Sequence, residues 1–144
     1  MSITVRPIER SDIVRCGQIG YEAHKAISSI HGYPPEQPSV EFAIDLIKKI
    51  VGNPNSWGVL AERQDKILGS IFLHNFPPSP VAVIGPLTVH PTEEGGVGKA
   101  LMDAALGEAR RQKKTESDWY NHQAISVPSY YIPNRGSAFE NHYF

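Results

Sequence analysis

Three glycines, Gly95, Gly96 and Gly98, lie between an apolar run and a segment with helical periodicity. The run 81–89 is rich in β-branched residues and predicts a buried strand, while apolar residues recurring from Val97 predict a helix. A strand, a tight turn and a helix start in this order are typical of an anion site. Unpaired backbone N–H groups and the positive end of the helix dipole meet at such a turn, and glycine lets the backbone approach the anion closely. The spacing therefore predicts a phosphate-type ligand here.

Two common phosphate-binding patterns do not fit this turn. The P-loop pattern places Gly98-Lys99 correctly, but it needs a glycine at Glu93 and a hydroxyl side chain at Ala100. The dinucleotide pattern G-x-G-x-x-G fits two of the glycines and fails at Leu101. A third alternative is that the glycines only shape a tight connection between the strand and the helix.

A fourth pattern fits the stretch from Pro86 through Pro91, the glycine-rich turn and the helix start after it. Together they resemble the acetyl-CoA-binding motif of the GNAT family of N-acetyltransferases, in which Val-x-Pro is followed by Gln or Arg and then by x-x-Gly-x-Gly or Ala. Either Glu93 or Glu94 takes the place of the Gln or Arg, and one residue is missing from the spacing in each alignment. A carboxylate therefore lies where a diphosphate is expected, and Lys99 is the nearby cation.

The resemblance implies acetyl-CoA as co-substrate and transfer of its acetyl group to a primary amine of a small molecule or peptide. In the family, the strand that matches Pro86 to Val89 pairs its backbone with the pantetheine arm, and a backbone N–H of this strand polarises the thioester carbonyl. The matching positions on the strand are Leu87 and Val89. The positions implied around the diphosphate are Glu94, Gly95, Gly96, Val97, Gly98, Lys99 and Ala100.

The sequence assigns no catalytic residue. The attacking amine must lose a proton, and in the family a carboxylate or a water chain commonly serves as the base. Glu22, Glu41 and His74 are conceivable bases, although each also suits an ordinary surface or loop position. The family often uses a tyrosine of a second motif as the acid, but that motif is absent here. We therefore assign that role to none of the tail tyrosines Tyr120, Tyr130 and Tyr131.

The elements that would position this site follow from local patterns. The sequence predicts helices that begin at Ser11-Asp12 and at Ser39, because these residues are typical helix caps. The full set is a strand at 3–7, helices at 11–27 and 39–50, hairpin strands at 57–62 and 67–73, a strand at 81–89 and a helix at 97–112. The order β-α-α-β-β-β-α predicts an α/β (α+β) protein with a GNAT-like mixed sheet, in which residues 1–112 form an incomplete GNAT domain.

Residues 113–144 do not continue the family pattern. A GNAT domain continues with a strand, a helix and a hairpin that often carry Arg-Leu-Val-Gln, then Asn, then Leu-Tyr-x-Lys-x-Gly-Phe. This segment is instead polar and aromatic, and Pro128, Pro133 and Gly136 interrupt what periodicity exists. We therefore expect the strand, helix and hairpin to be missing or irregular and the tail to lie outside the family domain.

The genetic code suggests why the tail departs from the pattern. When the third base of each codon is read with the first two bases of the next, residues 118–121 yield only Leu, Val, and then Gln or a stop. The same frame permits Arg before them and Asn after them, and Tyr130-Tyr131 yields only Leu. Residues 131–137 then permit Tyr-Thr-Lys-Ser-Gly-Phe. The sequence therefore predicts a frameshift between Gln112 and Thr115, which leaves a truncated family domain.

Composition narrows the class of protein. The 144 residues carry a net charge of −1 and one cysteine, Cys16, so no basic surface for nucleic acid or an anionic membrane is expected. One cysteine excludes a disulfide framework, and we expect Cys16 to be a packing residue in a reducing compartment. The histidines show no metal-ligand spacing, and no leader or membrane-spanning run is evident. A cytoplasmic protein without a metal is expected.

Two other functions remain open at this point. The chain could be a non-catalytic acyl-CoA-binding or interaction protein, or an inactive truncated product. The expected partners are the amine acceptor and, as one option, a second copy of the chain in a homodimer. The acceptor should contact the first two helices and the loop 31–39, where the sequence shows no motif.

Overall fold

The computed structural model describes residues 2–32, 37–78, 82–93, 95–112 and 119–121. The elements in chain order are β1 (Thr4–Pro7), the 3₁₀ turn η1 (Arg10–Asp12), α1 (Ile13–His31), α2 (Val40–Val51), β2 (Ser56–Arg63), β3 (Lys66–Asn75), β4 (Ala82–Val89), α3 (Val97–Arg111) and β5 (Trp119–Asn121). The predicted order of strands and helices is confirmed through α3. Ser39 caps α2 as predicted, because its hydroxyl accepts a hydrogen bond from the N–H of Phe42 at 3.1 Å.

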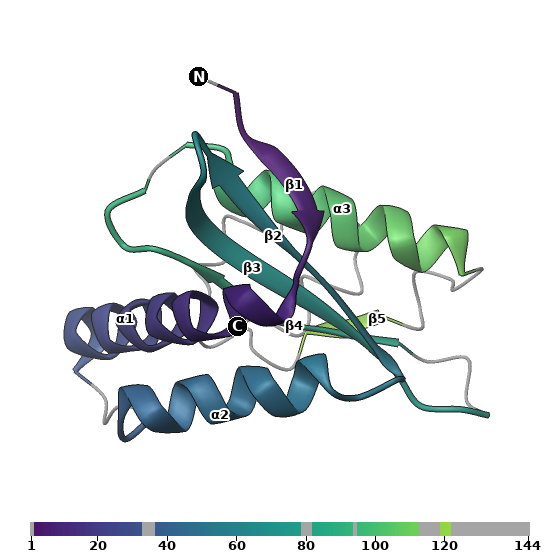
Figure 1. Ribbon diagram of the computed structural model, residues 1–144, viewed down its shortest axis with the longest axis horizontal. Coiled ribbons are helices and arrows are strands. Elements are labelled where there is room, and N and C mark those ends of the chain that lie inside the picture. The colour runs from purple at the N-terminus through teal and green to yellow at the C-terminus, as the bar shows by residue number, and fades with distance from the viewer. Residues whose placement is uncertain (1, 33–36, 79–81, 94, 113–118, 122–144) are drawn as a thin grey trace.

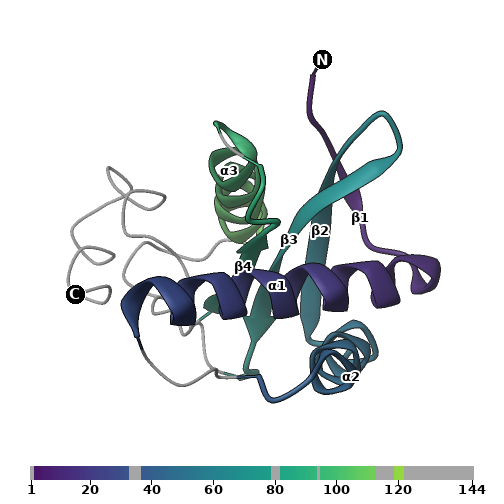
Figure 2. The ribbon, with the colours of Figure 1, turned by 90° about the vertical axis from the view of Figure 1, so that its left-hand side faces the viewer.

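The five strands form one mixed sheet. They lie in the order β1-β2-β3-β4-β5, with antiparallel pairing through β4 and parallel pairing between β4 and β5. The helices α1 and α2 cover one face of the sheet and α3 covers the other (Figures 1 and 2). In this three-layer arrangement, α3 is the next element after β4 in the chain.

Alternate residues of the strands pack into two separate cores, because successive side chains point to opposite faces of the sheet. The core against α3 contains Val59, Ala61, Ile71, Leu73, Ile84, Leu87, Val97, Leu101, Met102, Ala105, Leu106 and Ala109. The core against α1 and α2 contains Cys16, Ile47, Leu60 and Phe72. Cys16 is 1% exposed, and burial raises the pKa of its thiol to about 11. It is a packing residue, as the sequence indicates.

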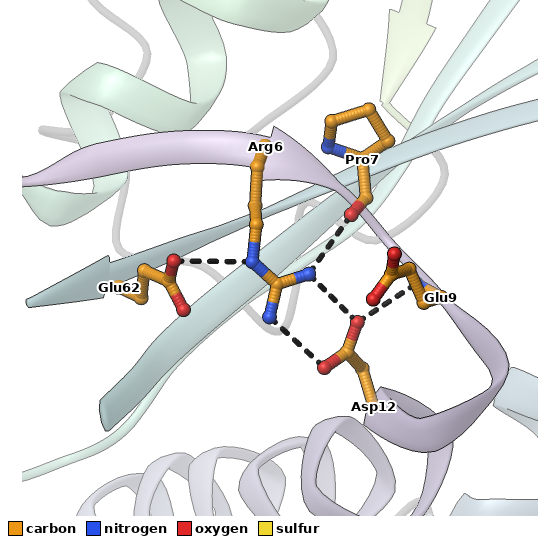
Figure 3. A network of polar contacts seen from close by, with 5 residues as sticks. All are labelled: Arg6, Pro7, Glu9, Asp12 and Glu62. Carbon is orange, nitrogen blue, oxygen red and sulfur yellow. Dashed lines mark hydrogen bonds and ion pairs between the residues drawn. The ribbon is translucent and has the colours of Figure 1, made fainter. Parts of the chain in front are cut away.

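A charged network joins β1 and β2 to the start of α1 (Figure 3). The Arg6 guanidinium donates to both carboxylate oxygens of Asp12 at 2.9 and 3.0 Å, and to Glu62 at 3.1 Å. Asp12 also accepts from the N–H of Glu9 at 2.7 Å. These hydrogen bonds, led by the one from Arg6, lower the pKa of Asp12. The predicted cap is thus partly wrong, because the Asp12 side chain closes η1 and makes no cap hydrogen bond to α1.

The strand β5 differs from the sequence-based expectation. We expected the fifth strand to be missing or irregular, yet Ala82, Val83 and Ile84 pair in parallel register with Trp119, Tyr120 and Asn121. A strand of three residues is too short for alternation of apolar and polar residues to be recognised. The rest of the predicted irregular tail, residues 113–118 and 122–144, lies outside the described residues.

Candidate functional site

Within the described residues, the second half of β4 has a strand partner on one side only, and we call its other side the open edge. On one side, β4 pairs with β3 up to Val89. On the other side, the pairing with β5 covers only Ala82 to Ile84 within the described part of the chain. Backbone groups on this side between Gly85 and Val89 can therefore pair with an extended ligand, as an added strand would, although Pro86 has no N–H to donate. Leu87 and Val89, the two strand positions implied by the sequence, both lie on this edge.

A bulge interrupts β4 where this open edge begins. Ile71 pairs with Leu87 and Leu73 pairs with Ile84, so Gly85 and Pro86 lie together opposite one residue of β3. Gly85 has a φ of 143°, a value that favours glycine. A bulge bends the strand and turns its backbone groups out of the regular ladder. The sequence did not predict the bulge, because a residue insertion shows only once two strands are paired.

The glycine-rich turn leads from β4 to the start of α3. Gly95 and Gly96 have φ of 69° and 101°, and a Cβ added at either would meet no atom within 4 Å. Glycine is therefore required here by the backbone conformation and not by crowding. No side chain caps α3, and no described atom accepts from the N–H groups of Val97 or Lys99. The turn presents backbone donors at the positive end of a helix.

The backbone N–H of Ala100 and the side chain of Lys99 both have partners in the structure. The N–H of Ala100 donates to the carbonyl oxygen of Gly96 at 2.9 Å, so Ala100 is not one of the available donors that the sequence suggested. Lys99, the predicted nearby cation, is exposed and pairs with Asp103 at 2.7 Å. Glu94 lies outside the described residues.

Glu93 forms an ion pair with a residue that the sequence did not identify. Nη1 of Arg63 lies 3.0 Å from Oε1 of Glu93, whose side chain is only 14% exposed. The backbone N–H of Glu93 also donates to the carbonyl oxygen of His90 at 2.9 Å. The carboxylate that the sequence predicted beside an anion is therefore paired with a guanidinium. Sequence reasoning placed Arg63 in a hairpin turn, whereas only Gln64 and Asp65 form that turn.

A cavity of about 350 Å³ lies on the α2 face of the sheet and reaches the bulge. Its lining consists of Leu46, Lys49, Ile50, Asn53, Ser56, His74, Phe76, Gly85 and Pro86. Of the three conceivable bases, the structure brings only His74 to the bulge, since Glu22 and Glu41 are exposed on α1 and α2. Sequence reasoning missed Ser56, which the register of β2 and β3 places opposite His74.

His74 connects β2 to the bulge through both ring nitrogens. Oγ of Ser56 lies 2.8 Å from Nδ1, and Nε2 lies 2.6 Å from the carbonyl oxygen of Gly85. The turn before β2 fixes Ser56, whose N–H donates to the carbonyl oxygen of Asn53 at 3.1 Å. The ring of His74 also stacks on Phe72, with centroids 6.4 Å apart. The imidazole therefore has a defined orientation beside the open edge of β4.

Within the described residues, we find neither a metal-binding cluster nor a membrane-spanning helix. No group of three or more His, Cys, Asp or Glu side chains there is arranged to hold a metal ion. In the same part of the chain, no helix combines the length and apolar character needed to cross a membrane.

Comparison with known proteins identifies the family. Residues 22–128 match the family model described as the acetyltransferase (GNAT) family. The chain belongs to the GNAT family. The match includes the open edge of β4, the glycine-rich turn and α3, and it extends through β5. No curated protein matches the sequence.

Solved GNAT structures share this fold at low sequence identity. A PaiA N-acetyltransferase from Thermoplasma acidophilum in complex with coenzyme A is 20% identical, with a TM-score of 0.61 over 79% of this chain and 76% of that chain. A GNAT family acetyltransferase from Brucella melitensis in complex with acetyl-CoA is 18% identical, with a TM-score of 0.61 over 78% and 71%. A GNAT family acetyltransferase from Staphylococcus aureus is 20% identical, with a TM-score of 0.56 over 84% and 85%.

Proposed function

We propose that this GNAT chain transfers the acetyl group of acetyl-CoA to a primary amine. The observation that carries the proposal is the open edge of β4 from Gly85 to Val89, which leads into the turn at Gly95 and Gly96 and the uncapped start of α3. Membership of an acetyltransferase family and structural neighbours with bound coenzyme A or acetyl-CoA support the choice of co-substrate.

The chain's backbone supplies most of the proposed binding site. The edge at Leu87 and Val89 would pair with the amide groups of the pantetheine arm, and a backbone N–H beside the bulge would polarise the thioester carbonyl. The diphosphate would lie at the turn, against the N–H groups of Gly95, Gly96, Val97, Gly98 and Lys99. Because Arg63 holds the Glu93 carboxylate, the turn remains suitable for an anion.

Two measurements test this function. Isothermal titration with CoA measures binding, and thiol release from acetyl-CoA with a panel of primary amines measures transfer. Lys99→Pro removes the N–H of the third residue of α3, in the first turn, where no described carbonyl accepts it, while Lys99→Ala removes only the side chain. We expect Lys99→Pro to bind CoA more weakly than Lys99→Ala, with equal thermal unfolding. Wild-type chain that binds no CoA would contradict the proposal.

We also propose that the chain after about Gln112 is translated out of frame. Support comes from residues 118–121, where the shifted frame forces Leu-Val and then allows only Gln or a stop, since this stretch contains β5, the strand beside β4. Sequencing the coding DNA across this junction tests the idea directly, and a shifted frame without Arg-Leu-Val-Gln would refute it. A chain rebuilt in the other frame should show faster transfer than the present chain. CoA binding without any transfer by the present chain would favour the non-catalytic alternative.

A further inference from the structure

The cavity beside the bulge contains a pair of side chains that can move a proton. Nε2 of His74 lies against the carbonyl oxygen of Gly85, and a carbonyl oxygen can only accept. Nε2 therefore carries a hydrogen, and Nδ1 of the neutral ring holds a lone pair that faces Ser56. The Ser56 hydroxyl donates to Nδ1, and its own oxygen lone pairs can accept a hydrogen bond from a molecule in the cavity.

We infer that the acceptor amine binds in this cavity and that Ser56 and His74 remove its proton. The inference rests on the acetyl transfer proposed above. The Ser56 oxygen accepts a proton from the substrate ammonium while the Ser56 hydroxyl proton moves to Nδ1 of His74. The step produces a neutral amine, an intact serine and an imidazolium.

The neutral amine then completes the transfer. Its lone pair forms the C–N bond to the acetyl carbon as the C–S bond of the thioester breaks. The departing thiolate takes the proton that the attacking nitrogen releases, and the imidazolium returns its proton to solvent. Ser56 is the catalytic residue that contacts the amine, and His74 acts through it.

The Gly85 carbonyl can keep its hydrogen bond to Nε2 when the ring of His74 gains a proton at Nδ1. The Gly85 carbonyl already accepts from Nε2, and such a hydrogen bond becomes stronger when the donor is charged. Among the described residues that line the cavity, Lys49 is the one with a charged side chain, and His74 is the other ionisable residue. Asp45 pairs with Lys49 at 3.1 Å, so the wall adds little net positive charge against an imidazolium.

The lining also indicates the kind of amine. Leu46, Ile50, Phe76 and Pro86 supply apolar wall, and the polar groups gather at Asn53, Ser56 and His74. The volume of about 350 Å³ is near the lower end for ligand pockets, roughly 300–1,000 Å³. The class expected is a primary amine on a small, uncharged, apolar body, in preference to a peptide or a polyamine.

A binding experiment that needs no turnover tests the cavity. The probe is 2-phenylethylamine, titrated into the whole chain while the imidazole signals of His74 are followed by NMR. We expect these signals to shift in wild type and to stay unmoved in Leu46→Phe, which fills the cavity. Saturating amine that leaves the His74 signals unmoved in wild type would overturn the inference. Thermal unfolding of each variant checks folding.

Kinetics test the proton route. We expect Ser56→Ala to lower kcat/KM for the amine about 100-fold, within the usual range for general-base catalysis, with the affinity for CoA unchanged. Ser56→Thr keeps a hydroxyl and should recover much of the rate, while Ser11→Ala, on an exposed residue of η1, should match wild type. His74→Gln retains a donor for Gly85 but should lose the fall of kcat/KM on the acid side.

The outcomes separate the two proposals. A wild-type chain that binds no CoA refutes acetyl transfer. Binding of CoA without transfer also refutes it. In either case, phenylethylamine that still shifts the His74 signals leaves an amine-binding cavity. Transfer by wild type with unchanged rates and pH profiles in Ser56→Ala and His74→Gln refutes the proton route alone. A preference for polyamines over phenylethylamine refutes the substrate class.

Discussion

Arg63 Nη1 lies 3.0 Å from Oε1 of Glu93, thirty positions further along the chain. The pair joins the end of β2 to the segment before the glycine-rich turn, so a cation reaches the turn from a different hairpin. In one of the two alignments with the family motif, Glu93 takes the place of a neutral or basic side chain, and in the other Glu94 does. Arg63 offsets the charge of Glu93.

Removal of Arg63 should therefore weaken CoA binding. Arg63→Gln leaves the Glu93 carboxylate without its partner beside the diphosphate site, and we expect a loss of affinity of about tenfold, roughly 1.4 kcal/mol. The double variant with Glu93→Gln removes both charges and should recover most of the loss. Titration calorimetry with CoA at low salt measures both effects. Equal affinities for the single variant and wild type would show that the pair does not influence the site.

Gly96 and Gly107 offer a matched test of the turn. Gly96→Ala places a side chain on a backbone with φ of 101°, and we expect a cost of about 1–2 kcal/mol and weaker CoA binding. Gly107 is an exposed residue inside α3 where an added Cβ meets nothing within 4 Å. Gly107→Ala should instead stabilise the chain by about 0.5–1 kcal/mol and leave CoA binding unchanged. Urea unfolding and calorimetry check both; similar changes in the two variants would contradict the expectation.

The Arg6–Asp12 contact should make folding sensitive to acid. Hydrogen bonding to Arg6 lowers the pKa of Asp12 in the folded chain below the unfolded value of about 3.9. The resulting stability is complete above the unfolded pKa and is lost as the pH falls through the folded pKa. Asp12→Asn should cost about 1–3 kcal/mol at pH 7, and progressively less as the pH falls through the folded pKa. Urea unfolding at several pH values measures this, and a difference independent of pH would disprove the linkage.

The thiol of Cys16 should be inert in the folded chain. Burial raises its pKa to about 11, so only about one thiol in ten thousand is ionised at pH 7, and the thiolate is the reactive form. We expect its reaction with a disulfide reagent to be at least about 100-fold slower in the native chain than in urea. Absorbance of the released thiol follows both reactions. Comparable rates in the two states would mean that Cys16 is accessible.

Local patterns predicted most of the elements because each pattern lies within one short segment. The apolar period of α3, the Ser39 cap of α2 and the hairpin strands are all readable from neighbouring residues. The same holds for the glycine-rich turn, where positive φ at Gly95 and Gly96 agrees with the residue type. The family followed from that one stretch, and the location proposed for the cofactor rests on it.

The contacts that complete the site were not readable, because they join residues that are far apart in the sequence. The Ser56–His74 contact spans eighteen positions and depends on the register between β2 and β3. The bulge at Gly85 and Pro86 exists only relative to β3, and β5 is recognisable only by its pairing with β4. Residue types within a strand or a helical turn therefore settled the elements and the glycine-rich turn that we propose as the anion site. Strand pairing settled which side chains meet around them, since no local signal specifies a partner across the sheet.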